Sequence, residues 1–334
     1  MTRPRATLVS PADTPYYHCI GRCVRRAFLC GADPLTGRNF DHRKALILAR
    51  LSLLTEVFAI DLCGYALMSN HYHLILRLAP ARAQQWSTQE IVARWCRLFS
   101  GPMFLRGYRN GGVLSEAEAV ELARLAGLWR SRLCDLSWFM RGLNEFIARQ
   151  ANAEDDCTGH FWEGRFRSQA LLDDAALITA MVYVDLNPVR VGLAQSVAAS
   201  DFTSGQQRLF EVTPAPAGGG AGNRPRLLPF VGALREGSED ALGYNLLDYL
   251  DLVDGTGRCV HPRTRGQIPD ATPVLLSVLG LAPGEWVKTV VELQRRFRLF
   301  IGSPHRLRQC AETRGWRRVS GVAAARRLYA KASE

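Results

Sequence analysis

Two histidines on a predicted strand are the residues best suited to chemistry in this sequence. His71 and His73 open the run His-Tyr-His-Leu-Ile-Leu-Arg-Leu, which predicts a strand over 71–78. Side chains alternate between the faces of a strand, so both imidazoles should lie on the same face. Such a pair can bind a divalent metal ion and leave positions open for water and phosphate oxygens. The spacing alone equally fits packing or a solvated strand face.

A tyrosine and an asparagine form the second candidate pair. Tyr183 and Asn187 are four residues apart on a predicted helix that Asp173 and Asp174 cap and Pro188 ends, so they should project from one side. A tyrosine hydroxyl can attack a phosphodiester and hold DNA as a phosphotyrosine. A free phenol has a pKa of about 10, so it is a weak nucleophile near pH 7. A metal ion bound partly by Asn187 could promote the attack by polarising the scissile phosphate. The alternative is that Tyr183 is a core aromatic residue and Asn187 only terminates the helix.

Arginines next to aromatic residues provide candidate DNA contacts, because guanidinium groups suit phosphates and aromatic rings suit unstacked bases. One group lies near 161–167 and another near the C-terminus. The candidates are Trp162, Arg165, Arg167, Arg314, Arg317 and Arg318, with Trp316 beside the last three. A strand edge or a basic surface helix with solvated arginines would look the same.

The elements that must position these residues follow a strand–helix–hairpin pattern. We expect a strand at 16–23, a helix from Asp41 to about 57, strands at 61–68 and 71–78, helices over 86–150, a strand at 166–172, and the tyrosine helix. This order predicts an α+β domain with an antiparallel sheet.

A Pro/Gly-rich stretch divides the chain. We expect a catalytic domain over 1–212 with a helical insert at about 86–150, a linker over 213–226, and a basic helical region over 227–334 that binds DNA. Helices are predicted near 244–253, 273–279, 285–300 and 318–331. The alternative is that this region packs on the sheet, since 244–252 is rich in Tyr and Leu.

Charge favours a polyanionic partner. The 334 residues include 42 Lys and Arg against 31 Asp and Glu, a net charge of +11, and residues 288–334 alone hold 12 basic and three acidic residues. No apolar run approaches the ~20 residues of a membrane span. The nine cysteines form no Cys-x-x-Cys pair. A cytoplasmic protein without a membrane partner is therefore expected.

Three blocks together resemble a known family. Residues 64–76 (GYALMSNHYHLIL), 160–168 (HFWEGRFRS) and 183–193 (YVDLNPVRVGL) are similar to those of the REP-associated tyrosine transposases, which belong to the HUH single-tyrosine transposases. The resemblance covers about residues 14–200. The long insert and the basic C-terminal region depart from compact members of that family.

The resemblance implies a fold, a metal and a reaction. It implies a ferredoxin-like or RRM-like antiparallel sheet with helices on one face, here with a C-terminal helical extension. His71, His73 and Asn187 would bind Mg²⁺ or Mn²⁺, and Tyr183 would cleave single-stranded or hairpin DNA through a 5′-phosphotyrosine. Arg190, in the third block, joins the expected DNA contacts. Location at the bacterial nucleoid is implied, and it stays open whether a homodimer shares its tyrosine helices.

Two other functions compete with this one. A domesticated transposase could bind hairpin DNA without cutting it, but it would be expected to have lost a histidine or the tyrosine. An RNA-binding sheet would carry exposed aromatic residues rather than a His-x-His pair. Because His71, His73 and Tyr183 are all present, the sequence favours the enzyme.

Overall fold

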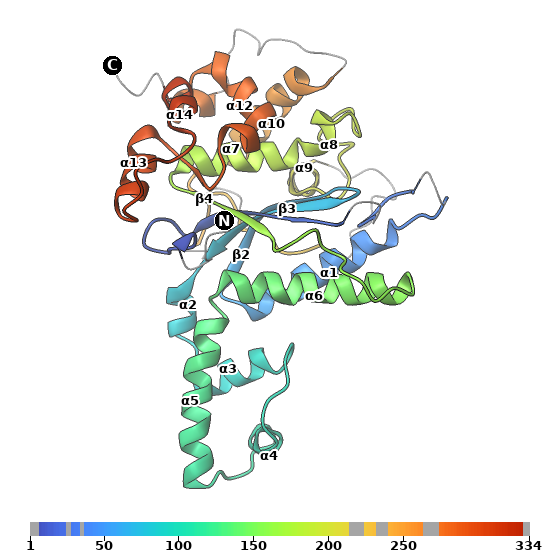
Figure 1. Ribbon diagram of the computed structural model, residues 1–334, viewed down its shortest axis with the longest axis vertical. Coiled ribbons are helices and arrows are strands. Elements are labelled where there is room, and N and C mark those ends of the chain that lie inside the picture. Colours follow the sequence, from blue (N-terminus) through green and yellow to red (C-terminus); the bar gives the residue numbers. More distant parts are fainter. Residues whose placement is uncertain are drawn as a thin grey trace.

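A five-stranded sheet runs through the middle of the molecule (Figure 1). The computed structural model describes residues 7–24, 28–33, 37–213, 224–231, 240–262 and 274–329. The strands are β1 (Tyr16–Arg22), β2 (Ile60–Leu67), β3 (His71–Leu78), β4 (Arg167–Leu171) and β5 (Phe300–Ile301). Their order is β2-β3-β1-β4-β5, and every neighbouring pair is antiparallel except β4 and β5, which are parallel.

The first four strands and two long helices have the predicted ferredoxin-like arrangement. The chain runs β1, α1 (His42–Val57), β2, β3, α6 (Leu136–Glu154) and β4, and β1 and β3 occupy the centre of the sheet. Helices α1 and α6 pack against each other under one face (Figure 1). The side of α1 that carries Ile47, Leu51 and Leu54, at helical spacing, is buried there. The α+β fold class is confirmed.

The opposite face of the sheet is also covered by helices, whereas the sequence predicted helices on one face only. Helix α7 (Asp174–Asp185) contacts β2, β3 and β4, and all its residues from Ala175 onward are buried. An apolar helix with no polar side needs partners all round. The sheet provides them below, and α10 (Leu246–Val260) and α12 (Pro283–Arg296) provide them above.

A helical lobe projects from the sheet (Figure 1). It contains α2 (Pro80–Gln84), α3 (Thr88–Trp95), α4 (Phe104–Arg109) and α5 (Glu116–Arg132). Helix α3 packs on α5, and the rings of Trp95 and Trp129 stack with centroids 5.2 Å apart. The stretch predicted as one insert over 86–150 therefore has two parts, because α6 within it belongs to the layer under the sheet.

The C-terminal region packs on the same core rather than standing apart from it. Its remaining elements are α8 (Asn187–Arg190), α9 (Ser204–Val212), α11 (Val274–Val278), α13 (Pro304–Glu312) and α14 (Val322–Leu328). Strand β5 extends the sheet by pairing with β4, and one continuous apolar cluster includes side chains from both halves of the chain. This is the alternative in which the C-terminal residues complete the core. Most of the predicted linker, 214–223, lies outside the described residues.

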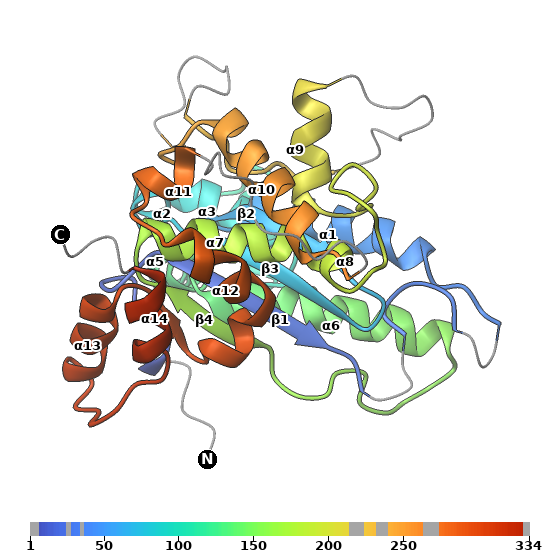
Figure 2. The same cartoon turned by 90° about the horizontal axis from the view of Figure 1, so that it is seen from above.

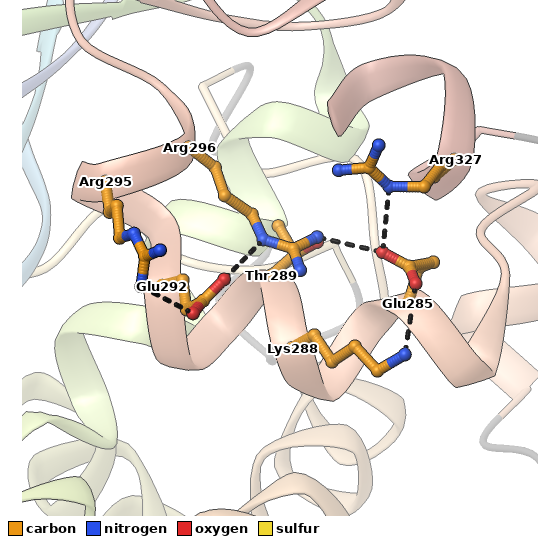
Figure 3. A network of polar contacts seen from close by, with 7 residues as sticks. All are labelled: Glu285, Lys288, Thr289, Glu292, Arg295, Arg296 and Arg327. Carbon is orange, nitrogen blue, oxygen red and sulfur yellow. Dashed lines mark hydrogen bonds and ion pairs between the residues drawn. The ribbon is translucent and has the colours of Figure 1, made fainter. Parts of the chain in front are cut away.

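Ion pairs connect the helices of this region (Figure 3). The Glu285 carboxylate accepts a hydrogen bond from Arg296 at 2.9 Å and pairs with Arg327 of α14 at 3.5 Å. Arg296 also donates to Glu292 at 3.0 Å. The helix predicted over 285–300 ends at Arg296, because Phe297 is extended and leads into β5.

Candidate active site

The two histidines of the His-x-His pair lie on β3, next to the centre of the sheet. They face the same side, as the strand period predicts, and their ring centroids are 4.9 Å apart. Ile20 of β1 lies opposite His73, and Arg22 lies opposite His71. His73 is buried, whereas His71 remains partly exposed at the end of the strand. The pair is therefore fixed by the sheet and open to solvent at one end.

Both histidines use one ring nitrogen for contacts within the protein. Nδ1 of His73 is 2.9 Å from Nε2 of His18, and Nδ1 of His71 is 2.7 Å from the Asn70 carboxamide oxygen. Nε2 of His73 is buried and has no hydrogen-bond partner in the described ranges. A buried polar atom without a partner costs free energy unless a ligand satisfies it. This nitrogen is therefore the best candidate for ligand binding at the site.

The surroundings keep these imidazoles neutral near pH 7. Burial lowers the pKa of His71 to about 4, and the positive charges of Arg22 and Arg190 act in the same direction. Burial and the neighbouring His18 also lower the pKa of His73 well below its usual value. A metal binds the neutral imidazole, so both side chains are in the form that a metal ligand requires.

Tyr183 lies on α7, far from the histidines in sequence, but its side chain contacts them in the fold. Its ring meets His73 edge-on with centroids 5.5 Å apart, and it meets His18 at 5.9 Å. The side chain is only 4% exposed. Tyr183 and the histidines belong to the same chain, so this arrangement needs no second copy to bring them together.

Asn187 and Arg190 continue the tyrosine side of the helix into α8. They follow Tyr183 by four and seven residues, which places the three side chains on one side of a helix. One guanidinium nitrogen of Arg190 donates to the Asn187 carboxamide oxygen at 3.1 Å and to the Tyr183 hydroxyl at a long 3.4 Å. Arg190 also lies over the tyrosine ring, 4.9 Å from its centroid. Asn187 is buried, and its amide nitrogen has no hydrogen-bond partner in the part of the chain that the structure describes.

Three arginines surround the histidines on this face. Arg22 lies opposite His71, Arg167 lies opposite Ile20 in the same row as His73, and Arg190 approaches from α8. Across the ranges that the structure describes, none of the three forms an ion pair with a carboxylate. Cations without acidic partners suit a bound polyanion, whose phosphates would supply the missing negative charge.

The donor set fits a metal ion that keeps several outside ligands. Among the described residues, no group of three His, Cys, Asp or Glu side chains could hold a metal ion. The site offers instead the His71 and His73 imidazoles and the Asn187 carboxamide, with one imidazole nitrogen buried and unpartnered. Mg²⁺ commonly retains waters and takes further ligands from substrate phosphates. These residues therefore fit such an ion when DNA contributes its oxygens.

The other predicted DNA contacts lie in different places. Trp162 contacts the ring of Tyr72 and donates to the Asn144 carbonyl of α6 at 2.9 Å, so it lies under the sheet, on the face opposite the histidines. Arg165 is exposed just before β4. Arg314 forms an ion pair with Asp13 and is largely covered.

Arg317 and Arg318 are exposed in the turn between α13 and α14. No contact joins either of them to the histidine site in the described part of the chain.

Three residues at the site were not predicted from sequence. His18 contacts both His73 and Tyr183, Gln169 contacts His18, and Arg22 lies opposite His71. Period-two alternation in the predicted strand 16–23 would place His18, Ile20 and Arg22 on one face. Which face that is depends on the pairing of β1 with β3, and a single strand's pattern does not contain that information.

Comparison with known proteins gives one structural similarity. No family model matches the chain, and no curated protein matches it. A solved structure of a REP-associated tyrosine transposase bound to a REP hairpin is similar over 68% of this chain and 99% of that chain. The identity is 13% and the TM-score is 0.36. Both values are low, so the function must be argued from the geometry of the site.

Proposed function

We propose that the protein is a metal-dependent endonuclease and strand transferase for single-stranded and hairpin DNA, with Tyr183 as the nucleophile. The observation that carries the proposal is the contact of the Tyr183 ring with His73, whose buried Nε2 has no hydrogen-bond partner among the described residues. Strands and a helix that are far apart in sequence bring Tyr183 close to two neutral imidazoles. The arginines beside them form no ion pair with a carboxylate in the described ranges. The three motif blocks that resemble REP-associated tyrosine transposases support the same reaction.

The reaction requires one bond to form and one to break. The Tyr183 oxygen attacks the scissile phosphorus, and the bond from phosphorus to the 3′ oxygen breaks. The products are a 5′-phosphotyrosine and, after protonation, a free 3′-hydroxyl. The phenol proton passes to water, and the departing 3′ oxygen takes a proton from water. Arg190 lies 3.4 Å from the Tyr183 oxygen, beside the atom that would attack. The reverse attack by a 3′-hydroxyl would rejoin a strand.

A metal ion and the arginines would both bind phosphates of the DNA. His71, His73 and Asn187 would hold Mg²⁺ or Mn²⁺, which when bound polarises the phosphate and stabilises its developing charge. Arg22 and Arg167 extend the positive surface beside the histidines and would bind the flanking phosphates. The net charge of +11 favours the same polyanionic substrate.

The two competing functions fit the site less well. A hairpin-binding protein without catalysis would not need Tyr183 beside neutral histidines. An RNA-binding sheet would present stacking aromatics, whereas the rows of side chains at this site contain His18, His71 and His73 with arginines beside them.

An assay for a covalent protein–DNA adduct tests the proposal. The protein is incubated with Mn²⁺ and a DNA hairpin that carries a single-stranded flank and a label on the 3′ side of the cleavage site, and adducts are resolved under denaturing conditions. Tyr183→Phe should abolish the adduct and leave hairpin affinity within about twofold, because the ring still packs. Tyr108→Phe, in the projecting lobe, is the matched control and should react normally. An adduct that persists in Tyr183→Phe would place the nucleophile elsewhere.

A further inference from the structure

A chain of hydrogen bonds reaches His73 from the C-terminal region. The Gln169 amide nitrogen donates to the Phe297 carbonyl at 2.7 Å, its oxygen lies 2.9 Å from Nδ1 of His18, and Nε2 of His18 lies 2.9 Å from Nδ1 of His73. All four residues are buried. The direction of each hydrogen bond can be assigned from what each group is able to donate.

The assignment starts at the backbone carbonyl, which can only accept. The Gln169 amide group must therefore turn its nitrogen toward Phe297, since the reverse orientation would place two oxygens in contact. Its oxygen then faces His18 and also can only accept. It follows that Nδ1 of His18 carries a hydrogen.

The position of the hydrogen on His73 follows from that on His18, because both rings are neutral. His18 is fully buried and has a carboxamide and an imidazole as its hydrogen-bond partners, and no carboxylate of the described residues bonds to it. A neutral imidazole with its hydrogen on Nδ1 accepts at Nε2. His73 must therefore donate from its own Nδ1, which leaves a lone pair on its buried and unpartnered Nε2.

We propose that Gln169 and His18 are positioning residues that hold His73 in the tautomer with its Nε2 lone pair available to a divalent cation. This proposal rests on the metal-dependent function proposed above and assigns the residues that orient its buried ligand. Hydrogen bonds from the second nitrogen of a ligating histidine generally fix its tautomer and ring orientation. Here that role falls to a second histidine and an amide on neighbouring strands.

The anchor of this chain of hydrogen bonds lies in the C-terminal region. Phe297 follows α12 directly, and α12 is joined to α14 through Glu285, Arg296 and Arg327 (Figure 3). The C-terminal region thus contributes a backbone carbonyl to the orientation of the site, and its helix α10 also contacts α8, which carries Asn187.

The tautomer of His73 in metal-free protein is the direct test. Long-range ¹H–¹⁵N correlation spectra of full-length, uniformly ¹⁵N-labelled protein at pH 7.5 distinguish a protonated from an unprotonated ring nitrogen, and His73→Gln assigns the signals. The expected result is a hydrogen on Nδ1 and none on Nε2 in both His18 and His73. A hydrogen on Nε2 of His73 would overturn the proposal, whatever the protein does with metals.

Gln169→Glu should reverse the direction of the hydrogen bonds. A carboxylate cannot donate to Phe297, and its charge favours a doubly protonated His18, whose Nε2 would donate to His73. His73 would then carry its hydrogen on Nε2 and lose its free lone pair. Mn²⁺ affinity, measured by electron paramagnetic resonance without DNA, should fall about 10- to 100-fold.

Gln207→Glu is the matched control. Gln207 also bridges two groups inside the protein, because it accepts from the Tyr65 hydroxyl at 2.9 Å and donates to the Pro225 carbonyl at 3.1 Å. It contacts no histidine, so Gln207→Glu should leave the His73 tautomer and the Mn²⁺ affinity as they are in the wild type. Equal loss of Mn²⁺ affinity in both variants would overturn the proposal.

These measurements distinguish failure of the positioning role of Gln169 and His18 from failure of the proposed function. If the tautomer is as expected and Gln169→Glu reverses it, but the wild type binds no Mn²⁺, the positioning role stands and metal dependence fails. If Gln169→Glu weakens Mn²⁺ binding while the His73 tautomer stays unchanged, the positioning role fails and metal dependence stands. Should Gln169→Glu not fold, the wild-type spectrum alone still decides the tautomer.

Discussion

The two histidines of the His-x-His pair have different surroundings, and this difference matters for their function. His73 is buried and held through His18, whereas His71 lies at the end of β3 and is held by the neighbouring Asn70. A ligand held by a buried network loses little freedom when it binds a cation. We therefore expect His73 to be the more rigid of the two residues that would hold an ion.

Both histidines should be required for cleavage. His71→Ala and His73→Ala should each reduce the rate of adduct formation at least about 100-fold, because each removes a proposed direct metal ligand. Excess EDTA should abolish the activity of the wild type, and added Mn²⁺ should restore it. His305→Ala, at an exposed position on α13, should react normally. Full activity in EDTA would contradict a metal-dependent mechanism.

Asn187 should influence the metal less strongly than the histidines do. Its carboxamide oxygen accepts a hydrogen bond from Arg190, and a water molecule could replace it as a ligand. Asn187→Ala should raise the half-saturating Mg²⁺ concentration several-fold while the rate at saturating Mg²⁺ stays within about tenfold of the wild type. The measurement is a Mg²⁺ titration of adduct formation. An unchanged half-saturating concentration would show that Asn187 only terminates the helix.

The sequence contains enough information to identify some of these residues but not to place all of them. The period of two puts His71 and His73 on one face, and the helical period puts Asn187 beside Tyr183. The meeting of Tyr183 with His73 depends on α7 packing over β3, which no local pattern specifies. Trp162 illustrates the limit, since closeness in sequence to Arg167 does not show that its ring lies under the sheet.

At the scale of elements, α7 is the part that positions Tyr183, the proposed nucleophile. Asp173 caps its start by accepting from the Ala176 amide at 2.9 Å and also accepts from the Ser303 amide and the Tyr329 hydroxyl. Near its end, the buried Asp185 accepts from the Gly205 amide at 2.8 Å and the Tyr249 hydroxyl at 2.5 Å. Contacts at both ends of the helix thus restrict its movement over the sheet.

The central strands should give the protein a characteristic loss of stability in acid. Burial lowers the pKa of His18 to about 4, with a further contribution from Arg167, while the unfolded chain keeps a value near 6.5. Between these values the unfolded chain binds more protons, so the free energy of unfolding should fall as the pH drops from 6.5 to 4 and stay level above 6.5 as far as His18 is concerned. One such histidine contributes about 1.4 kcal/mol per pH unit.

Urea unfolding of the metal-free protein at several pH values provides the measurement. His18→Asn should reduce the slope between pH 6.5 and 4 by about the contribution of one histidine, and His305→Gln should leave it unchanged. If His18→Asn has the slope of the wild type, then His18 is not held neutral by the fold.

Most elements were predictable, and those that were missed depend on partners elsewhere in the chain. The hairpin of β2 and β3 and the helix after Asp173 follow from alternation, turn residues and a cap. Strand β5 has two residues and lies at the end of a stretch predicted to be helical. It exists because Phe300 and Ile301 pair with β4, a contact that the sequence of 285–300 does not encode by itself.

At the scale of the whole molecule, part of the C-terminal charge is paired within the protein. Of the 12 basic residues in 288–334, three are partly covered and form contacts within the protein: Arg296, Arg306 and Arg314. Three more pair with glutamates but stay exposed: Lys288, Arg295 and Arg327. Others are exposed: Arg298, Arg308, Arg317, Arg318 and Arg326. A net charge counted from the sequence therefore overstates the number of cations available to DNA.

Deleting 213–334 would not separate DNA contact from folding. The deletion removes β5 from the sheet edge and removes α10 and α12 from the buried surface of α7. It would also remove the Phe297 carbonyl from Gln169. Substituting exposed arginines in the full-length chain tests DNA contact without these losses.

Arg317→Ala combined with Arg318→Ala should weaken DNA binding and reduce its dependence on salt. Each phosphate contact that is lost lowers the slope of log affinity against log salt by about 0.7 to 0.9, because fewer counterions are released. Cleavage of saturating substrate should continue at the wild-type rate, since neither residue touches the histidine site. The measurement is hairpin affinity at several KCl concentrations for catalytically inactive Tyr183→Phe with and without these two substitutions.

The matched control for this pair is Arg124→Ala combined with Arg149→Ala. These exposed arginines of α5 and α6 carry the same two charges, and each has an intrahelical glutamate partner. If Arg317 and Arg318 contact the DNA directly, their loss should change the salt slope and the control should not. An equal change in both double variants would mean that overall charge attracts the DNA, and an unchanged slope in the Arg317 and Arg318 variant would remove the turn between α13 and α14 from the binding surface.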